Sequence, residues 1–322
     1  MHDVCAIIVS FNSKRWLDGA LSSLYAGAEG IDLDVVVVDN GTDDAAGYVE
    51  ERFPAARTLR CENRGFGHAN NRGLESADAR YVLFLNPDTE VLGGSLRELV
   101  AALDRRPGTG LAGVRQVDSH GSLAPSIRRF PSTANMLAEA LWVERVPGLR
   151  LWLGERELDP RQYARETACD WTAGSFMIAR REALADSGGF DERFFLFSEE
   201  TDLCWRIKQA GWEVAHLPEL TIRHYEHEGG LGAQLEAQAA YARLQFARKH
   251  LSRPGAYRGA MALRYGLRAG LCSLLGDRKR RQREAAREAL ATTRSGRPPF
   301  GAPDASTPQV SGNDRQRTGV GA

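Results

Sequence analysis

Short apolar runs and helical segments alternate along the first hundred residues, and this alternation constrains the fold more than any other feature. Continuous runs of β-branched or aromatic residues predict four buried strands, at residues 4–10, 34–39, 56–61 and 81–85. The intervening segments predict crossover helices at residues 14–25, 43–53 and 67–77. Such a series implies the α/β class, with a mainly parallel sheet that carries helices on both faces. Ligands bind such sheets beyond the carboxyl ends of the strands.

The rest of the chain is less regular but contains further predicted elements. Residues 128–169 show no clear period and predict an irregular insert. Residues 294–322 consist largely of Gly, Pro, Ser, Thr and Arg, have almost nothing to bury, and are therefore predicted to be disordered. The other predicted elements are a helix at 94–104, a hairpin at 111–127 that turns at 118–121, a regular segment at 171–180, a helix that opens near Ser198, strands at 214–217 and 220–224, and helix from 232 to about 293.

The composition is that of a soluble globular protein. Of the 322 residues 43% are hydrophobic and 26% are charged, and the mean hydropathy is −0.38. No apolar run reaches the roughly 18 residues that span a bilayer, which argues against an integral membrane protein. The five cysteines are scattered and form no C-x-x-C pair, so neither a disulfide framework nor a zinc knuckle is indicated. The first residues lack the features of a signal peptide, so a cytoplasmic location fits best.

Charge is unevenly distributed along the chain although the net charge is zero. Residues 243–297 hold fifteen Lys and Arg against three acids, a net of +12. Such a block indicates an anionic partner, and the scarcity of aromatic residues for base stacking argues against nucleic acid. A helical stripe beside Arg264 and Arg268 favours a helix that lies on an anionic membrane surface; it consists of Leu263, Leu267, Leu271 and Leu274. The alternative is a helix packed on the rest of the protein or on a second copy in a homo-oligomer.

Polar clusters follow three of the predicted strands. They are S-F-N at residues 10–12, D-N-G at 39–41 and N-P-D at 86–88. A dinucleotide site of the Rossmann type needs G-x-G-x-x-G in the first turn, where this chain has no glycine, so NAD is disfavoured. Residues 65–73 contain the first two glycines of a G-x-G-x-x-G motif but have Asn70 in place of the third, so they do not form the dinucleotide motif either.

These clusters belong to a series of motifs that resembles the family 2 glycosyltransferases of the GT-A fold. The series consists of D-N-G at 39–41, N-R-G-F-G-H-A-N-N at 63–71, L-N-P-D at 85–88, G-G-F-D-E at 188–192 and E-E-T-D-L at 199–203. The second and third motifs, with R-F-P-S at 129–132, resemble the bacterial rhamnosyltransferase branch in particular. The resemblance covers about residues 3–230.

The resemblance implies a domain organisation. Residues 1–231 would form the GT-A catalytic domain, with a nucleotide-binding half to about residue 110 and an acceptor-side half at 111–231. Residues 232–293 would be a basic amphipathic helical extension, and 294–322 a disordered tail. The irregular insert would be mobile or face the acceptor.

A nucleotide-sugar donor carries a diphosphate, whose charge a hard divalent cation neutralises as the glycosidic bond breaks. The resemblance implies that Asp88 holds Mg²⁺ or Mn²⁺, and that Asn86 replaces the first acid of the family's D-x-D pair. Asn86 can still hydrogen-bond a ribose hydroxyl or a water. A histidine in related enzymes also ligates the metal, which implicates His224, with His227 as the rival. In the alternative without a metal site, Asp88 caps the next helix and both histidines are surface residues without a role.

The nucleotide pocket is predicted from the first strand ends. Asp39 follows four valines, where an uncompensated charge would be costly, so it should face an open site. By resemblance it accepts hydrogen bonds from the pyrimidine or ribose of the donor. The other residues predicted to bind the nucleotide-sugar are Ser10, Asn12, Asn63, Gly67 and Asn70. A helix N-cap role for Asp39 or Asn40 is the alternative.

A base must remove a proton from the acceptor hydroxyl as it attacks the anomeric carbon. By resemblance this base is Glu200, where the family usually has Asp, and Glu199 is a possible substitute. Acids also cluster in the first turn of a helix because the macrodipole favours them. Glu199, Asp202, Trp171 and Gly174 are assigned to the acceptor side, although Trp171 would fill the core equally well.

The sequence therefore predicts an inverting, metal-dependent glycosyltransferase. The suggested donor is dTDP-L-rhamnose and the acceptor a hydroxyl of a lipid-linked saccharide or polysaccharide, at the inner face of the cell membrane. A sugar-nucleotide nucleotidyltransferase would share the architecture but needs a glycine-rich basic first loop, which residues 10–13 lack. A non-catalytic membrane-associated scaffold that retains the fold is the alternative from another class.

Overall fold

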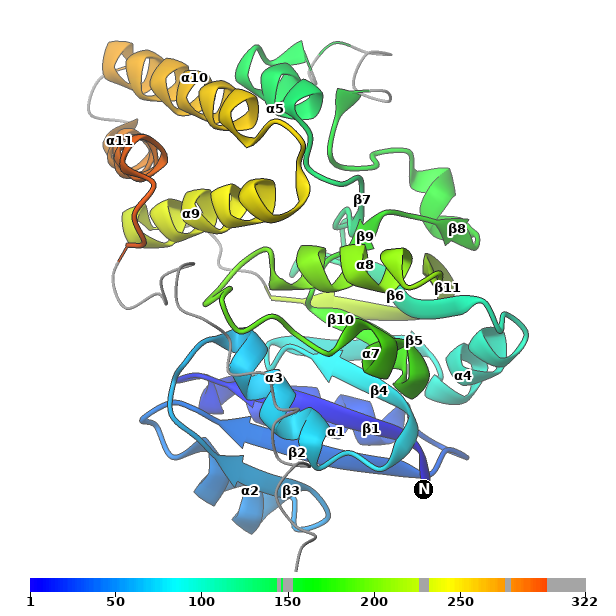
Figure 1. Cartoon of the computed structure of the whole chain (residues 1–322). Helices are drawn as coiled ribbons and strands as arrows, with labels where there is room; N and C mark the ends of the chain where they lie inside the picture. The colour runs from blue at the N-terminus through cyan, green and yellow to red at the C-terminus, as the bar shows by residue number, and fades with distance from the viewer. Residues whose placement is uncertain (144–145, 147–152, 226–231, 276–278, 300–322) are drawn as a thin grey trace, which may run out of the picture.

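The structure is a computed structural model that describes residues 1–143, 146, 153–225, 232–275 and 279–299 (Figure 1). Its first part alternates strands and helices as predicted. In chain order the elements to residue 117 are β1 (His2–Ser10), η1 (Lys14–Trp16), α1 (Leu17–Ala26), β2 (Leu33–Asp39), α2 (Ala45–Arg52), β3 (Arg57–Arg60), α3 (Phe66–Glu75), β4 (Ala79–Leu85), β5 (Thr89–Gly94), α4 (Leu96–Asp104) and β6 (Thr109–Val117).

The second part adds short strands, more helices and a C-terminal group of long helices. Its elements are β7 (Ile127–Arg128), α5 (Thr133–Ala140), η3 (Pro160–Ala164), β8 (Thr167–Ala168), β9 (Trp171–Thr172), β10 (Phe176–Arg180), α7 (Arg181–Ser187), α8 (Glu199–Gln209), β11 (Glu213–His224), α9 (Ala233–His250), α10 (Pro254–Leu274) and α11 (Arg280–Ser295).

One large sheet organises the molecule, with strand order β3-β2-β1-β4-β10-β6-β11-β5 and β8 paired to β11. The strands β3, β2, β1 and β4 are parallel, as is the pair β6 and β11, whereas β10, β5 and β8 run antiparallel to their neighbours. Ser10 lies opposite Asp39 and Ile8 opposite Leu85, so three strands end at one edge. The predicted strand-end clusters therefore lie together.

Helices cover both faces of the sheet, as predicted. In β1, Val4, Ala6 and Ile8 pack on one face, where the core includes side chains of α1, α2 and α4. The alternate residues Cys5 and Ile7 pack on the other face with α3, α7 and α8. Because successive strand residues point to opposite faces, a continuous apolar run is what a doubly covered strand requires.

The structure differs from the prediction after residue 86 and near residue 218. Strand β5, which the sequence did not predict, directly follows the N-P-D segment, and α4 begins only at Leu96. The two strands expected at 214–217 and 220–224 are one strand, β11, whose register shifts between Leu217 and Thr221. Pro218 lies in this interval and has no N–H to donate to the ladder, which accounts for a bulge there.

The hairpin predicted at 111–127 is only partly formed. Its turn is present, because the Asp118 side chain accepts hydrogen bonds from the backbone N–H groups of His120 and Ser122. The returning chain makes a single bridge, Leu123 to Val117, and then pairs elsewhere, as β7 with β9 in a second small sheet.

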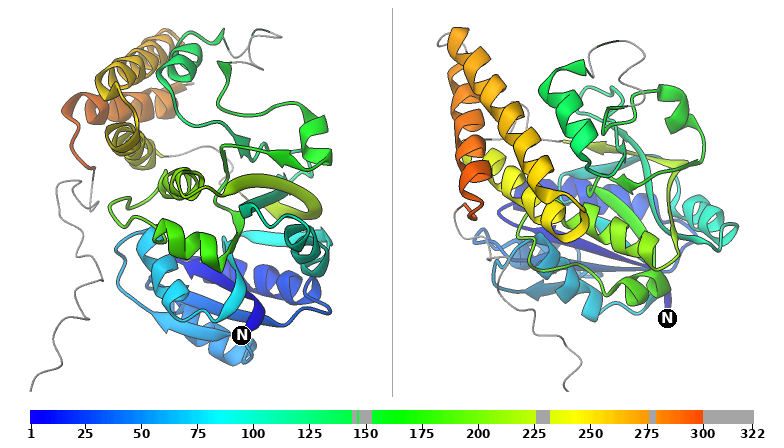
Figure 2. Two further views of the ribbon diagram at one scale, coloured as in Figure 1. Left: turned by 45° about the vertical axis from the view of Figure 1, so that its right-hand side comes forward. Right: turned by 45° about the horizontal axis from the view of Figure 1, so that its top comes forward.

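The C-terminal helices α9, α10 and α11 pack together with α5 at the end of the molecule opposite the N-terminus (Figures 1 and 2). Their shared core includes Met136, Leu244, Tyr257, Met261 and Tyr265. The predicted helical extension is therefore present, and α10 also packs on the rest of the protein through one face. Helix α11 continues to Ser295, two residues into the tail predicted to be disordered at 294–322, and the part of that tail from residue 300 lies outside the described residues.

Candidate active site

Loops after β1 and β2 are held by the side chains predicted to bind a nucleotide. Asp39 is buried and accepts hydrogen bonds from the backbone N–H groups of Gly41 (3.0 Å) and Ala46 (2.9 Å), in the turn and in the first turn of α2. Asn12 has a left-handed backbone (φ 52°), and its Oδ1 accepts from the Thr42 N–H at 2.8 Å. The N-cap alternative for Asp39 or Asn40 is wrong, because the N-cap of α2 is Asp44, although Asp39 does bind a backbone N–H in the first turn of that helix.

The remaining residues of the predicted nucleotide pocket lie around the same edge. Ser10 is fully buried, and its hydroxyl has no hydrogen-bond partner among the described residues. Asn63 is exposed, and its Oδ1 accepts from the Gly65 N–H at 3.3 Å. Asn70 donates to the Phe66 carbonyl at 3.0 Å, and a Cβ on Gly67 would lie 3.2 Å from that of Phe190. Gly67 therefore has a close packing contact.

The residues predicted to bind metal come together from two distant parts of the chain. Asp88 precedes β5 and His224 ends β11, and the antiparallel pairing of these strands places His224 opposite Thr89. The Asp88 Oδ1 lies 3.2 Å from the His224 Nε2, and the Asn86 Nδ2 lies 3.4 Å from the same nitrogen. A strand, and not a helix, follows Asp88, so the helix-capping alternative for Asp88 is wrong.

A carboxylate and an imidazole nitrogen at this separation are suitable ligands for a divalent ion. Within the described part of the chain, no group of three or more His, Cys, Asp and Glu gathers at one point. The rival His227 lies outside the described residues. Asp88 and His224 therefore fit a metal that takes its other ligands from the substrate or from water.

The acidic pair begins helix α8. Residues Phe197 and Ser198 both have left-handed backbones (φ 69° and 63°), so the chain turns sharply into the helix. Glu199 is 5% exposed, whereas Glu200 is partly exposed. The Oε2 atoms of both lack hydrogen-bond partners among the described residues.

Burial raises the pKa of both carboxyl groups. The pKa of Glu199 lies well above its ordinary value because of burial and of the neighbouring Glu200 charge. Burial also raises the pKa of Glu200, although the positive charge of Arg128 opposes the rise. A carboxyl with a raised pKa, on a residue that is itself partly exposed, suits a general base near neutral pH.

Residues Gly174 and Ser175 lie between the predicted metal site and the acidic pair. The Asn86 N–H donates to the Ser175 carbonyl at 2.9 Å. A Cβ atom on Gly174 would lie 3.5 Å from the Cβ of Glu200. One short loop therefore contacts Asn86 on one side and Glu200 on the other.

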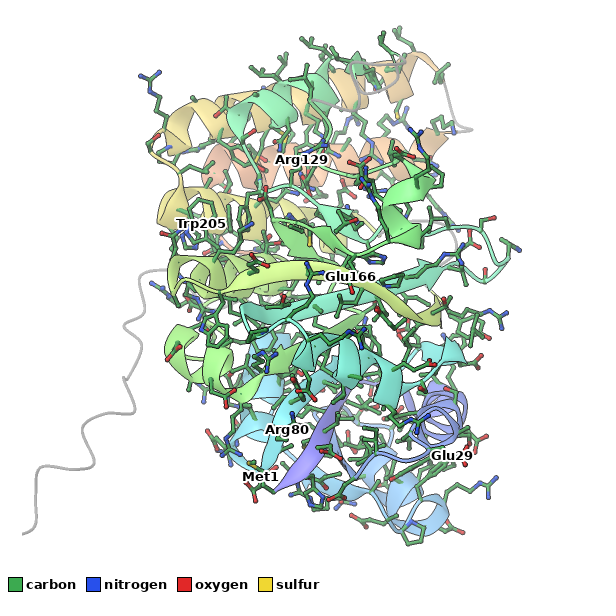
Figure 3. The ribbon with its side chains drawn as sticks, turned by 90° about the vertical axis from the view of Figure 1, so that its right-hand side faces the viewer. Met1, Glu29, Arg80, Arg129, Glu166 and Trp205 are labelled. Carbon is green, nitrogen blue, oxygen red and sulfur yellow. The ribbon has the colours of Figure 1, made fainter. Side chains whose placement is uncertain are left out.

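Two predicted acceptor-side residues have structural contacts instead. Asp202 is fully buried, and its carboxylate contacts Lys249 (2.6 Å), His250 (2.6 Å) and Arg206 (2.7 Å), which favours a structural role over the predicted acceptor contact. Trp171 is 7% exposed and donates from Nε1 to a backbone carbonyl at 2.8 Å, which favours the core alternative. Figure 3 shows Trp205, from the same helix as Asp202, where α8 faces α9.

Arg128 was not among the predicted site residues, although its charge acts on Glu200. It belongs to β7, and its guanidinium lies 5.4 Å from the ring centre of Trp171. Arg129, the next residue, lies between the large sheet and α10 (Figure 3). The sequence signal was present, because Arg128 directly precedes the R-F-P-S motif.

Known proteins resemble this chain along most of its length. The model of glycosyl transferase family 2 matches residues 5–186. An N-acetylglucosaminyl-diphospho-decaprenol L-rhamnosyltransferase of Mycobacterium tuberculosis is 32% identical over 244 residues, covering 70% of this chain and 77% of the relative. The rhamnosyltransferase WbbL of Escherichia coli is 26% identical over 232 residues, covering 70% and 84%.

Solved structures share the fold. The mannosyltransferase PcManGT of Pyrobaculum calidifontis, in complex with GDP-Man and Mn²⁺, aligns with a TM-score of 0.55 at 18% identity, covering 91% of this chain and 89% of that one. GalNAc-T7 with UDP, GalNAc and Mn²⁺ aligns with a TM-score of 0.60 at 13% identity, covering 92% and 56%. The chain is thus a glycosyltransferase with the GT-A fold, and it belongs to glycosyl transferase family 2, in its rhamnosyltransferase-like branch.

Proposed function

We propose that this glycosyltransferase moves L-rhamnose from dTDP-L-rhamnose, with inversion, onto a hydroxyl of a lipid-linked saccharide. The observation that carries this proposal is the contact of Asp88, His224 and Asn86 at one sheet edge, joined to Glu200 through Gly174 and Ser175. The names of the relatives from M. tuberculosis and E. coli support the sugar, and the former also supports a diphosphate-linked lipid acceptor.

A divalent ion, Mg²⁺ or Mn²⁺, is part of the proposal. Asp88 and His224 would hold it, and two protein ligands leave several positions for diphosphate oxygens and water. When bound, the ion neutralises charge on the leaving diphosphate. Asn86, beside His224, carries no charge and would hydrogen-bond the donor's ribose or a water.

Glu200 would accept the proton of the attacking hydroxyl. Inversion requires a single displacement, with the base on the side of the sugar opposite the diphosphate. Glu200 is separated from Asn86 by the loop of Gly174 and Ser175, which is consistent with a position across the sugar from the metal. The raised pKa of Glu200, caused by burial, strengthens it as a base.

The place of action proposed is the cytoplasmic face of the cell membrane, with the protein bound peripherally. Among the described residues, no helix combines the length and the apolar character that crossing a bilayer would need. A lipid-linked acceptor, as named for the M. tuberculosis relative, would be reached from the membrane surface.

The test measures donor binding and transfer with the full chain. Thermal unfolding with dTDP, UDP, GDP and their sugars, each with and without Mn²⁺, should show the largest stabilisation for dTDP-L-rhamnose with Mn²⁺. Transfer from this donor to an N-acetylglucosaminyl-diphospho-lipid is then followed by mass spectrometry.

Asp88→Ala should abolish metal-dependent stabilisation and lower transfer at least about a hundredfold while the protein stays folded. Asp32→Ala, which removes a carboxylate that is 65% exposed, is the matched control and should leave both unchanged. Full activity of Asp88→Ala would reject the metal role of Asp88. If another nucleotide sugar stabilises the protein and dTDP-L-rhamnose does not, the proposed donor is rejected.

A further inference from the structure

We propose that Arg128 and Arg156 form a binding site for the diphosphate of the acceptor, beside Glu200. This inference rests on the proposed function and adds to it the group that recognises the anionic part of the acceptor. Neither arginine was predicted as a site residue from the sequence.

Backbone pairing places the two arginine side chains next to each other. Arg128 and Arg156 form an antiparallel bridge. The hydrogen bonds beside the bridge are Arg129 N–H to the Glu155 carbonyl (2.8 Å) and Glu157 N–H to the Ile127 carbonyl (3.0 Å). The arginines thus occupy a non-hydrogen-bonded pair, in which side chains share one face and Cβ atoms are only about 4.5–5.5 Å apart.

The other neighbour of Arg128 is Trp171, its partner in the pairing of β7 with β9. Three side chains, Trp171, Arg128 and Arg156, therefore stand in a row across adjacent segments. The indole ring lies beside the Arg128 guanidinium, at 5.4 Å from its centre. The planar ring of Trp171 limits the directions in which the N–H groups of the Arg128 guanidinium can point.

Two like charges directly opposite each other destabilise a strand pair unless an anion lies between them. Burial lowers the pKa of Arg128, and the charge of Arg156 lowers it further. Within the described ranges, neither guanidinium has an ion-pair partner within 4.0 Å, and the Arg128 Nε is buried without a hydrogen bond. Glu155, the adjacent carboxylate, instead contacts Arg243 at 3.3 Å.

An oxyanion with several acceptor oxygens satisfies such a pair, because each guanidinium binds phosphate oxygens bidentately. Position indicates that the anion belongs to the acceptor. Arg128 pairs with Trp171, three residues before Gly174, and Gly174 contacts Glu200, the proposed base, which must lie beside the acceptor hydroxyl. The charge of Arg128 also acts on Glu200. The donor's diphosphate belongs at Asp88 and His224, on the far side of the 174–175 loop.

The first experiment tests binding without catalysis. Inorganic pyrophosphate is added to the full chain in EDTA, so that metal cannot hold it at Asp88, and thermal unfolding is measured. The wild type should gain stability, and Arg156→Gln should not. Arg165→Gln is the matched control: it removes an exposed arginine of the same segment, whose guanidinium donates to Gln162 and to no other described residue, and it should respond as the wild type does. An equal shift for Arg156→Gln and the wild type would overturn the site.

The second experiment assigns the anion to the acceptor. Two acceptors are compared that share sugar and lipid, one linked by diphosphate and one by an uncharged spacer. Arg156→Gln should raise KM for the diphosphate acceptor at least about tenfold, leave KM for the donor within twofold, and have no effect with the uncharged acceptor. Arg156→Lys, which keeps the charge but not the fork, should recover part of the loss.

The outcomes separate this inference from the proposed function. A rise in KM for the donor would assign the pair to the donor's diphosphate and overturn the inference. An unchanged KM for both substrates would do the same. If the protein stabilises with pyrophosphate through Arg156 but transfers no sugar, the proposed function fails while the anion site remains.

Discussion

Glu199 and Glu200 are adjacent in the chain but differ in exposure, and this difference favours Glu200 as the proposed base. Only Glu200 is partly open, and it adjoins Gly174 in the loop that contacts Asn86. We expect Glu200→Gln to lower kcat at least about a hundredfold with donor affinity retained, because general base catalysis contributes at least this much. Glu199→Gln is the matched control and should cost less than tenfold. A larger loss for Glu199→Gln would move the base to that residue.

The buried Glu199 makes stability depend on pH. Burial and the Glu200 charge raise its pKa in the folded state, so the folded protein binds this proton more tightly than the unfolded chain. Its contribution to stability is therefore complete below the ordinary glutamate pKa of about 4.3 and is lost as pH rises through the folded value. Glu199→Gln removes this loss.

Urea unfolding of the wild type and of Glu199→Gln checks this prediction. The variant should be the more stable protein at pH 8, by about 1 kcal/mol or more, since one pKa unit corresponds to about that energy. The difference should shrink toward pH 5. An equal difference at the two pH values would contradict the assignment of a raised pKa to Glu199.

The predicted site residues that the structure brings together are those at strand ends. Asp88 and His224 meet because the strands that carry them pair, and strand ends are visible in the hydrophobic pattern. The burial of Asp202 was not foreseen, because its spacing from Glu200 does not reveal that α9 covers it. The pairing of Arg156 with Arg128 was not foreseen either, because it occurs in a segment without periodicity.

At the scale of elements, a buried ionic cluster joins α8 to α9. Lys249 contacts both Asp202 and Asp191 at 2.6 Å, and His250 contacts Asp202 at the same distance. Burial alone would raise the pKa of Asp202, but His250, Arg206 and Lys249 hold it below its ordinary value. The N-terminal end of α8, with Glu200, is thereby fixed against the C-terminal helices.

Asp202→Asn should destabilise the protein by about 3 kcal/mol, because it removes the fully buried carboxylate that binds Arg206, Lys249 and His250 together. Asp18→Asn is the control; its carboxylate is 51% exposed and pairs with Arg52 at 3.3 Å, so its loss should cost less than about 1 kcal/mol. Chemical unfolding measures both. Equal effects of the two changes would show that the cluster does not anchor α8.

The sequence predicted the helices and parallel strands of the first hundred residues well, because their periods are clear. It failed where an element depends on a distant partner. Strand β5 forms by pairing with β11, and β11 continues past Pro218 because a bulge accommodates the proline. Neither fact has a local signal beyond Pro218, which favours separate strands.

At the scale of the whole molecule, much of the positive charge of the C-terminal helices is used internally. Arg264 contacts Glu139 at 3.1 Å, Arg268 contacts Glu236 at 3.0 Å, and Arg258 donates to the Thr293 carbonyl at 2.8 Å. The sequence therefore overstates the charge available to a membrane. The leucine stripe of α10, in contrast, lies outside the packed core, with exposed fractions of 41% at Leu263 and 85% at Leu274.

The leucine stripe is opposite the face of α10 that packs on its neighbours, and we propose that it docks on anionic lipid. Exposed basic residues at the start of α11, Lys279 to Arg281, follow α10 and would complement the lipid charge. The neighbouring helix α5 adds exposed Leu137, and its C-cap residue Leu141 is also exposed. Helices α5 and α10 lie side by side at the end of the molecule away from the N-terminus (Figures 1 and 2).

Vesicle sedimentation with 30 mol% phosphatidylglycerol tests this surface with the full chain. The double variant Leu267→Gln, Leu271→Gln should lower the partition coefficient at least about tenfold, because burying a leucine contributes about 1.5–3 kcal/mol. Leu92→Gln, at a leucine that is 44% exposed on β5, is the matched control and should bind as the wild type does. Wild-type binding should also weaken with salt and on zwitterionic vesicles, because the lipid charge contributes. If the double variant keeps its vesicle binding but changes from dimer to monomer in light scattering, the stripe joins two copies of the chain and does not contact lipid.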